Sequence, residues 1–262
     1  MKLHRIRAVI LRHTCEARHN LNRIAETVYW PVQNIVVWGF FTIYLARDNQ
    51  LRPGAVSFLL GAAILWGMFY AFQRDLATGF LEELWSRNLV NLFSTPLSIS
   101  EYLTGLIIVN LLKAMIGMLA AALTAWVCYA YDFFPKFVEF IPFMLNLALF
   151  ALAIGVIIIG LIVRYTTRVQ TLAWSFAGLL MPFSCVFYPL SSLPRYLHPI
   201  AWALPTTHAF EGMRQAIAGG GFSMLHFGWG IALDGVYFMF AIPIFQKMFE
   251  SARSRGLLVK LE

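Results

Sequence analysis

Long stretches without a charged residue limit this chain to folds that a lipid bilayer can surround. Four such stretches contain between 20 and 26 residues each, and two further stretches are interrupted by a single internal charge, Lys113 or Asp234. A bilayer core about 30 Å thick needs roughly 20 mostly apolar residues per spanning helix, and backbone groups in lipid must be hydrogen-bonded internally. The sequence therefore predicts about six transmembrane helices. Their expected bounds are 27–46, 53–73, 102–130, 140–163, 170–190 and 224–246.

Composition agrees with a membrane location for the whole chain. Hydrophobic residues make up 60% of the 262 positions and charged residues only 13%. A soluble domain carries roughly 25% charged residues, because its surface must stay hydrated. The chain lacks the charge to cover a water-facing surface of its size, which excludes a soluble enzyme. We interpret residues 1–262 as a single all-α polytopic membrane domain.

The distribution of Lys and Arg predicts the orientation of the spans. Six spans place both termini on one side of the membrane. The segments expected on that side hold 14 Lys and Arg, whereas the segments on the other side hold five. Because cytoplasmic loops carry the excess of positive charge, we expect both termini in the cytoplasm and the chain in the plasma membrane. Topology and attraction to anionic lipid explain the net charge of +7, so nucleic-acid binding is not needed to account for it.

Residues 1–25 alternate apolar and basic side chains. The apolar positions approximate one face of a helix and the basic positions the opposite face. A secretory signal has instead an unbroken apolar core followed by a small-residue cleavage site. We expect an amphipathic helix lying in the membrane interface, with a frayed basic tail as the alternative. The basic residues are Lys2, Arg5, Arg7, Arg12, Arg18 and Arg23.

The cytoplasmic stretch from Arg74 to Glu101 reads RDLATGFLEELWSRNLVNLFSTPLSISE. Its apolar residues recur every three to five positions, which indicates a short amphipathic helix over 75–95 beside the membrane. Pro96 should end that helix, and Ser98 can cap the next one, whose first residues include Glu101. The alternative is a surface helix that merely links two spans.

The outward stretch 182–221 contains five of the eleven prolines, with very apolar pieces between them. Such a segment is too broken to span the membrane and too apolar for water, which indicates a re-entrant or interfacial segment shielded by neighbouring helices. Glu211 and Arg214 are three residues apart on an expected short helix, a spacing suited to an ion pair. A plain periplasmic loop is the alternative. The prolines are Pro182, Pro189, Pro194, Pro199 and Pro205.

Recognisable catalytic and cofactor motifs are missing from the sequence. It contains no GxxxxGK[ST] phosphate loop, HExxH, paired CxxC or GxSxG motif. The six histidines are dispersed, and we expect His4, His13 and His19 to be solvated on the basic arm. Cys128 and Cys185 both fall near outer ends of spans, where a bridge is conceivable but small core residues are the better interpretation. We expect no metal and no cofactor on this chain.

Lys113 and Asp234 are the two charges expected inside the membrane. Intramembrane charge is a functional hypothesis by default, and the two residues could line a pathway or pair with each other. The alternative for Lys113 is a side chain that snorkels to the interface. For Asp234 it is a position near the headgroups.

Two runs of this sequence together resemble the ABC-2 type transporter permeases. The run FLEELWSRNLVNLFSTPLSISEYL resembles the family's cytoplasmic coupling segment, with Thr95-Pro96-Leu97-Ser98 and Glu101 at the start of the third span. The run YPLSSLPRYLHPIAWALPTTHAFEGMRQAIAGG resembles the family's outer segment. There the proline pattern and the acidic-to-arginine pair are matched by Pro189, Leu193-Pro194, Pro205, Glu211 and Arg214. The layout agrees over nearly the whole chain, and the motifs cover about a fifth of it.

The resemblance implies a permease that pairs with a second permease chain, identical or related, and recruits separate ABC ATP-binding subunits. Those subunits would hold ATP and Mg, so this chain would not itself be an enzyme. It would export a lipid, drug or glycan-like substrate. The expected contacts with the ATPase are Glu82, Glu83, Leu84, Trp85, Arg87 and Leu89. The residues expected in the substrate pathway or its gate are Lys113, Asp234, Phe187, Tyr188, Glu211 and Arg214.

Three other functions compete with the transporter. A membrane scaffold would need six helices but neither a broken outer segment nor a docking-like inner helix. An ion-coupled secondary carrier would use Lys113 and Asp234, yet such carriers often show internal repeats and broken helices in both halves. A membrane enzyme acting on lipid is disfavoured by the missing catalytic motifs.

Overall fold

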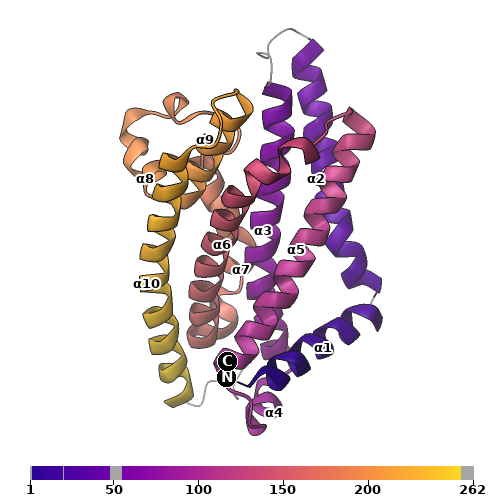
Figure 1. Cartoon of the computed structure of the whole chain (residues 1–262). Helices are drawn as coiled ribbons and strands as arrows, with labels where there is room; N and C mark the ends of the chain where they lie inside the picture. The colour runs from indigo at the N-terminus through magenta and orange to yellow at the C-terminus, as the bar shows by residue number, and fades with distance from the viewer. Residues whose placement is uncertain (1, 20, 48–54, 255–262) are drawn as a thin grey trace.

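The computed structural model describes residues 2–19, 21–47 and 55–254, and these residues form helices and no strand. Long helices stand side by side in a bundle, and α1 lies obliquely across one end (Figure 1). Arg52 and residues 255–262, whose Lys and Arg contribute to the predicted orientation, lie outside the described ranges. The longer elements are α1 (Leu3–His19), α2 (Leu21–Arg47), α3 (Ala55–Trp85), α4 (Leu89–Ser94), α5 (Ile99–Tyr129), α6 (Phe137–Tyr165), α7 (Leu172–Leu180), α8 (His198–Trp202), α9 (Pro205–Ile217) and α10 (Met224–Ser254). Single 3₁₀ turns are η1 (Phe134–Lys136), η2 (Thr166–Val169), η3 (Met181–Phe183), η4 (Leu190–Ser192) and η5 (Arg195–Leu197).

Four helices are long and apolar enough to cross a membrane: α3, α5, α6 with η1, and α10. This confirms an all-α membrane protein and leaves the number six without confirmation. Helix α2 has 27 residues, which suffices in length. It falls below the other four in hydropathy because Gln33 and Asn34 interrupt its apolar sequence.

The span expected over 170–190 is not a single helix. Helix α7 ends at Leu180, and one 3₁₀ turn follows before the chain bends. Pro182 cannot donate a backbone hydrogen bond to the preceding turn, and Cys185 has a positive φ of 51° that no α-helix accommodates. The apolar length of this region is therefore divided between a short helix and irregular chain.

The separate amphipathic helix expected over 75–95 is not formed as one element, because its residues are divided between α3 and α4. Residues 75–85 continue α3 without a break, because no proline or cap signal interrupts them. Arg87 adopts a positive φ of 55° and turns the chain, after which α4 forms one short helix. Glycine or asparagine usually occupies such a position at a helix end, so the sequence carries no obvious signal for this turn.

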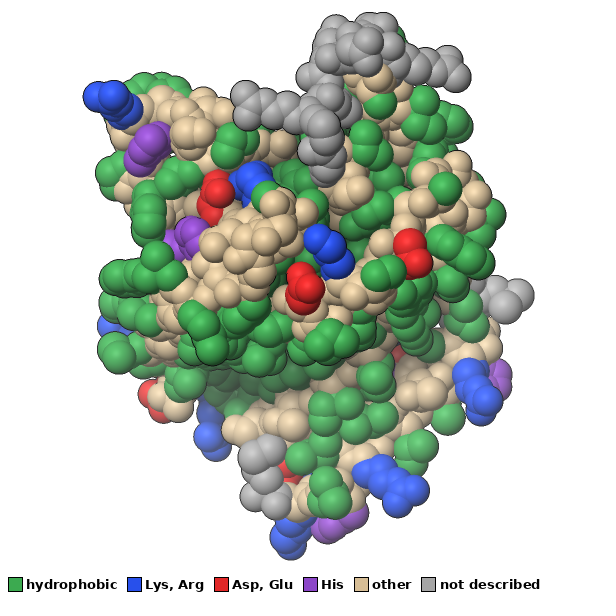
Figure 2. Space-filling view, turned by 45° about the horizontal axis from the view of Figure 1, so that its top comes forward, with side chains coloured by type: hydrophobic (Ala, Val, Ile, Leu, Met, Phe, Trp, Pro, Cys, Tyr) green, Lys and Arg blue, Asp and Glu red, His purple; other side chains and the backbone are tan. Residues whose placement is uncertain are grey.

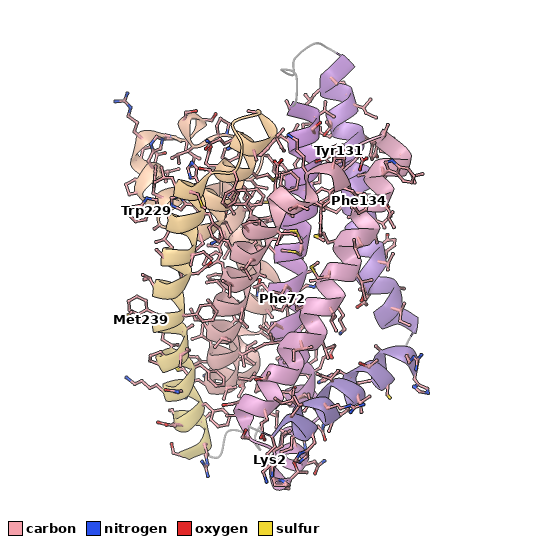
Figure 3. All side chains as sticks on the ribbon, in the orientation of Figure 1. Lys2, Phe72, Tyr131, Phe134, Trp229 and Met239 are labelled. Carbon is pink, nitrogen blue, oxygen red and sulfur yellow. The ribbon has the colours of Figure 1, made fainter. Side chains whose placement is uncertain are left out.

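Helix α3 is the centre of the bundle. It contacts α2 and α5 on one side and α6 and α7 on the other, and α10 packs against α6 and α9. Fully buried phenylalanines fill the space between α3, α6 and α9, with Phe72 near the middle of the bundle (Figure 3). Trp229 and Met239 point away from the bundle on α10 (Figure 3), and both are more than half exposed. A surface of this kind suits lipid rather than water.

We name the two ends of the bundle after their helices. The α1 end carries α1, α4 and the last turns of α3 and α10, and the α9 end carries α8 and α9 (Figure 1). Hydrophobic side chains are spread over much of the face shown in Figure 2, and Lys and Arg lie along its lower part, toward the α1 end, as well as singly in its upper part. Tyr131 and Phe134 lie in the connection between α5 and α6, nearer the α9 end (Figure 3).

Candidate functional site

Helix α1 is fixed to the bundle by charged groups on α3 and α5. Arg12 donates to Glu83 with 2.6 Å between Nη2 and Oε1, and Asn88 donates to the other carboxylate oxygen at 2.7 Å. The Glu83 side chain is only 4% exposed. One buried carboxylate therefore holds both α1 and the turn that follows α3.

Glu101 forms the second attachment of α1. Ser98 and Glu101 form a capping box at the start of α5, as the sequence predicts, with each side chain accepting from the other's backbone N–H. The carboxylate also accepts from the backbone N–H of Lys2 at 2.7 Å and from Arg5 at 3.3 Å. The cap of α5 thus also holds the first turn of α1.

The apolar face of α1 lies on α5. Ile6 and Val9 are buried, and a Cβ on Gly105 of α5 would fall 2.7 Å from Val9, so the two helices approach closely because that residue is glycine. His13 is 6% exposed and lies beside the Tyr102 ring. The expectation of a solvated His13 is wrong, because the residue lies on the buried face, one helical turn beyond Val9. Burial lowers its pKa from the usual value for histidine.

The six residues expected to contact an ATPase have different surroundings. Leu84 and Leu89 are 3% and 1% exposed, so both belong to the core of this chain, and Glu83 is occupied by α1. Trp85 is 45% exposed and stacks on Trp174 of α7 with ring centroids 6.2 Å apart. Arg87 is also exposed, whereas Glu82 faces a pocket described next. Of the six expected contacts with the ATPase, Trp85 and Arg87 are exposed at the surface of the α1 end.

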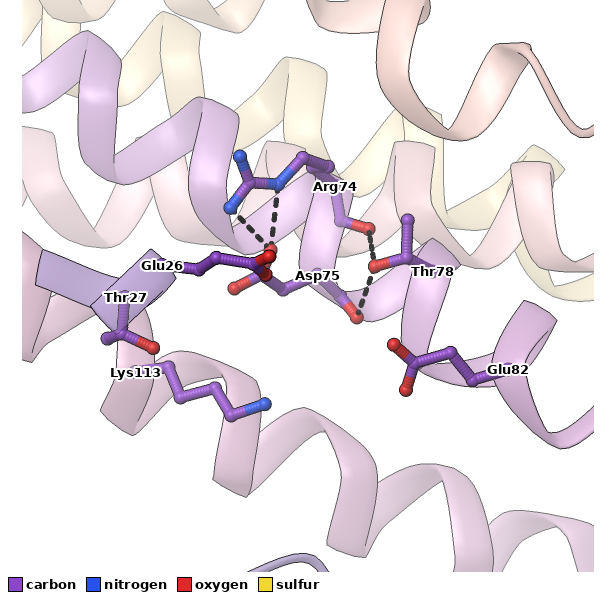
Figure 4. A pocket seen from close by; sticks show the side chains of 8 residues that line it. Glu26, Thr27, Arg74, Asp75, Thr78, Glu82 and Lys113 are labelled. Atoms are coloured by element: carbon purple, nitrogen blue, oxygen red, sulfur yellow. Dashed lines mark hydrogen bonds and ion pairs between the residues drawn. The ribbon is translucent and has the colours of Figure 1, made fainter. Parts of the chain in front are cut away.

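A polar pocket lies between α2, α3 and α5, near the α1 end (Figure 4). Its volume is about 70 Å³. Three carboxylates and two cations face it, and Arg74 binds Asp75 at 2.8 Å. Lys113, expected to be an intramembrane charge, reaches into this pocket from α5 (Figure 4). The lining residues are Glu26, Thr27, Arg74, Asp75, Thr78, Gly79, Glu82 and Lys113.

An apolar crevice continues along the same three helices toward the α9 end. It holds about 10 Å³, and Asn34 is its only side chain with a polar group. Small side chains leave this space unfilled, and a Cβ added to Gly67 would meet no atom within 4 Å. Its lining residues are Pro31, Asn34, Ile35, Ala63, Ile64, Gly67, Met68, Ala71, Ala114, Met118 and Ala121.

Asp234 lies between α10 and α6. It is 2% exposed and accepts a hydrogen bond from Asn146 at 2.7 Å. A Cβ on Gly230 would fall 2.5 Å from the Asn146 side chain, so glycine lets α10 approach α6 here. The structure therefore does not bring Asp234 and Lys113 together: each has its own surroundings on different helices.

Glu211 and Arg214 form the expected ion pair on α9, with 2.7 Å between Oε1 and Nη1. Glu211 also accepts from the backbone N–H of Leu190 at 2.7 Å, and Arg214 donates to the carbonyl of Cys185 at 3.1 Å. The Arg214 guanidinium lies 4.2 Å from the ring centroid of Phe58 on α3. The pair thus fixes the chain between α7 and α9 to the bundle.

Two aromatic residues expected in the pathway also hold the outer segment. Phe187 stacks on Trp38 of α2 with centroids 4.0 Å apart. The Tyr188 hydroxyl donates to the carbonyl of Pro182. Cys185 is buried and Cys128 exposed, and both are free thiols, as is the exposed Cys15. The conceivable bridge is therefore not formed.

The α3 side of the pocket has a signal in the sequence, because the polar residues Arg74, Thr78 and Glu82 recur every four positions. Most of α3 is buried, but its accessible residues recur at Gly67, Ala71, Arg74, Thr78 and Glu82, with spacings of three or four. Such spacing places them on one face of a helix. In the sequence, the charge of Arg74 predicts the end of a span, and this hides the stripe.

The family comparison gives the class of the protein. The model of the ABC-2 type transporter family matches residues 13–218, a range that includes α2 to α9 entirely. The chain therefore belongs to the ABC-2 type transporter family, and it is a transport membrane subunit. The comparison with curated proteins gives no match.

Proposed function

We propose that this chain is the permease subunit of an ATP-driven exporter in the plasma membrane. Separate ABC ATP-binding subunits would hold ATP and Mg and supply the energy, and the substrate would be a lipid, drug or glycan-like molecule. The family match over 13–218 carries this proposal.

The α1 end offers a surface suited to a motor subunit. Trp85 ends α3, Arg87 lies in the turn that follows, and Asn91 and Ser94 belong to α4; all four are exposed. An aromatic anchor beside a cation is typical of the few residues that dominate protein interfaces. Because α3 is one uninterrupted helix of 31 residues from this surface through the bundle, movement at Trp85 would tilt the whole helix.

The orientation follows from the same proposal. The α1 end, with its basic side chains, would face the cytoplasm, with both termini there. Helix α2, and α7 together with η3 and the chain after it, would complete six crossings, and the α9 end would hold the outer re-entrant segment. Two motor subunits need two docking surfaces, so we expect a dimer of permease chains, identical or related.

Co-purification tests the proposal directly. The tagged chain is isolated from its native membrane in mild detergent, and associated proteins are identified and assayed for ATP hydrolysis. We expect a stoichiometric partner with a phosphate-loop motif and measurable ATPase activity. A chain that is isolated alone, with no ATPase bound, would contradict the exporter and favour a scaffold or an ion-coupled carrier.

A further inference from the structure

We propose that the polar pocket and the apolar crevice form one binding site for a zwitterionic phospholipid-like amphiphile. Its phosphate would lie beside Lys113, its ammonium group toward Glu82, and its tail along the crevice. The inference rests on the proposed function, because it makes this amphiphile the class of substrate that the permease takes up.

The two cavities are parts of one path along α3. The accessible stripe of α3 begins with Gly67 and Ala71 in the crevice and continues through Arg74 and Thr78 to Glu82 in the pocket. On α5 the junction falls between adjacent residues, since Lys113 faces the pocket and Ala114 the crevice. At 1.5 Å per residue, the stripe is roughly 22 Å long, which suits a headgroup with part of an acyl chain.

The charged groups of α3 are spread along this path. Arg74 and Asp75 bind each other at the end next to the crevice, and Glu82 lies about two helical turns further toward the α1 end. Lys113 of α5 and Glu26 of α2 face the same pocket. A zwitterionic phospholipid likewise spreads its charges along its length, with the phosphate next to the tails and the amine at the far end. Arg74 is already bound to Asp75, so Lys113 is the better placed cation for the phosphate.

The pocket has room for a headgroup, and the open edge of the crevice gives access for a tail. The pocket volume of about 70 Å³ is several times the volume that one water molecule needs, so a small polar group fits there. The crevice, at about 10 Å³, is too narrow to enclose an acyl chain. Its accessible edge, at Asn34, Gly67 and Ala71, lets the tail lie along the seam between α2 and α3, in contact with surrounding lipid.

The pocket lies at the level where a headgroup of the inner leaflet would be. Helix α1 lies across the bundle just below it, with Arg12 bound to Glu83 next to the pocket residue Glu82. An amphipathic basic helix of this kind marks the headgroup layer. The carboxylates would select an ammonium group over a purely anionic head.

Binding of a defined lipid to the purified full chain tests the site. Native mass spectrometry measures the Kd of dioctanoyl phosphatidylethanolamine and of dioctanoyl phosphatidylglycerol, which has the phosphate but no ammonium. We expect one saturable site that prefers the ethanolamine lipid. Lys113→Met should weaken binding of both lipids about tenfold, because each loses a charge-assisted contact to phosphate. Glu82→Gln should weaken only the ethanolamine lipid.

Matched substitutions separate the site from general effects. Lys247→Met and Glu250→Gln remove charges from exposed positions on α10 near the same end and should leave both Kd values unchanged. Gly67→Leu should fill the crevice and weaken binding roughly tenfold, whereas Gly67→Ala fits the open space. Gly178→Leu, at another glycine with open space around it, is the control for added bulk.

The results distinguish this inference from the proposed function. Equal Kd values for the parent chain and for Lys113→Met, Glu82→Gln and Gly67→Leu would overturn the amphiphile site, even where an ATPase co-purifies. Site-dependent binding in a chain without any ATPase partner would overturn the exporter, and with it the assignment of the amphiphile as substrate.

Discussion

Asp234 is a carboxylate in the middle of a packed helix pair, and a single neighbour compensates it. The hydrogen bond from Asn146 satisfies one carboxylate oxygen, while Gly230 allows the close approach that makes this bond possible. A buried polar group costs little when both partners are present and much when one is removed. The pair therefore contributes more to the specificity of α6–α10 packing than to net stability.

Replacing one partner should be far worse than replacing both. Asn146→Leu leaves Asp234 buried without a donor, and we expect the free energy of unfolding to fall by about 3 kcal/mol. The double variant Asn146→Leu, Asp234→Leu should lie within about 1 kcal/mol of the parent. Thermal unfolding in detergent measures both. Equal losses in the single and double variants would show that the hydrogen bond is not the controlling interaction.

At this scale the sequence is informative for local contacts and poor for distant ones. The Ser98–Glu101 capping box and the Glu211–Arg214 pair both follow from a spacing of three residues. The Arg12–Glu83 contact joins residues 71 positions apart, and no periodicity specifies which carboxylate a basic arm will meet. For the same reason the sequence does not indicate that Lys113 of α5 and Glu26 of α2 meet the polar face of α3 in one pocket.

At the scale of elements, α1 is attached to the bundle in two ways, by apolar packing and by an ion pair. Its apolar face packs on α5, and Arg12 binds Glu83 of α3. Because Glu83 also holds Asn88, α1 and the turn before α4 share one anchor. Disturbing that anchor should affect both segments together.

Glu83→Gln should loosen α1. The substitution removes the charge that Arg12 pairs with, and because Arg12 is 39% exposed we expect a modest loss of about 1 kcal/mol. The rate of limited trypsin cleavage within residues 1–19, followed by mass spectrometry, measures the change. Each arginine variant also removes one trypsin site, so the rates are compared at Arg5 and Arg18, which every chain retains. Arg12→Met should act like Glu83→Gln there, while Arg7→Met, at an exposed position on the same helix, should not. Unchanged cleavage in Glu83→Gln would contradict the anchor.

The docking of α1 should also weaken in acid through His13. Burial is the main cause that lowers its pKa in the folded state; Arg12 and Lys113 act in the same direction, and Glu83 and Glu16 oppose them. The unfolded or detached state therefore binds a proton more readily, so stability is complete above the ordinary pKa of about 6.5 and falls as the pH drops below it.

Trypsin cleavage is unsuitable over this pH range, so thermal unfolding between pH 8 and pH 5.5 is the measurement. We expect the unfolding midpoint of the parent chain to fall more steeply in acid than that of His13→Gln, which cannot titrate at this position. His4→Gln, at an exposed position of the same helix, is the control and should keep the parent slope. Identical slopes for the parent and His13→Gln would refute this effect.

The outer segment depends on α9 in a similar way. Arg214→Leu removes the ion pair to Glu211 and the hydrogen bond to the Cys185 carbonyl, so the segment should open more often. In a background with Cys15→Ser and Cys128→Ser, maleimide labelling reports only on buried Cys185. We expect labelling roughly tenfold faster in Arg214→Leu than in the parent, and no change in Arg195→Leu at an exposed arginine. Slow labelling in all three chains would show that contacts other than those of Arg214 keep the outer segment closed over Cys185.

Element boundaries show where hydropathy stops being informative. The uncharged run over 170–190 has the length of a span, yet Pro182 and the positive φ of Cys185 divide it. Conversely, charges at Arg74 and Asp75 suggested a helix end, although α3 continues for ten further residues to Trp85. Charge shows where a chain can leave lipid, whereas helices end where backbone hydrogen bonding ends.

At the scale of the whole molecule, one continuous helix connects the α1 end with the interior. Helix α3 carries the exposed Trp85 at its last turn and the polar pocket along the turns just before it, and it contacts α2, α5, α6 and α7. A force applied at Trp85 would therefore reach the pocket without crossing a loop. Family membership and this continuity together make the end of α3 the best candidate for coupling.

Trp85→Ala should weaken the attachment of the ATP-binding subunit. Exposed tryptophans at interface centres commonly contribute 2 kcal/mol or more, so we expect affinity to fall at least about tenfold. Trp229→Ala removes a similarly exposed tryptophan from α10, near the α9 end, and should leave attachment unchanged. Co-purified ATPase per permease, and its rate of hydrolysis, are measured for all three chains. Substituting Leu84 or Leu89 would destabilise the permease itself, because both are core residues, so Trp85 gives the cleaner test. Full attachment and full hydrolysis in Trp85→Ala would show that the ATP-binding subunit does not dock at the end of α3.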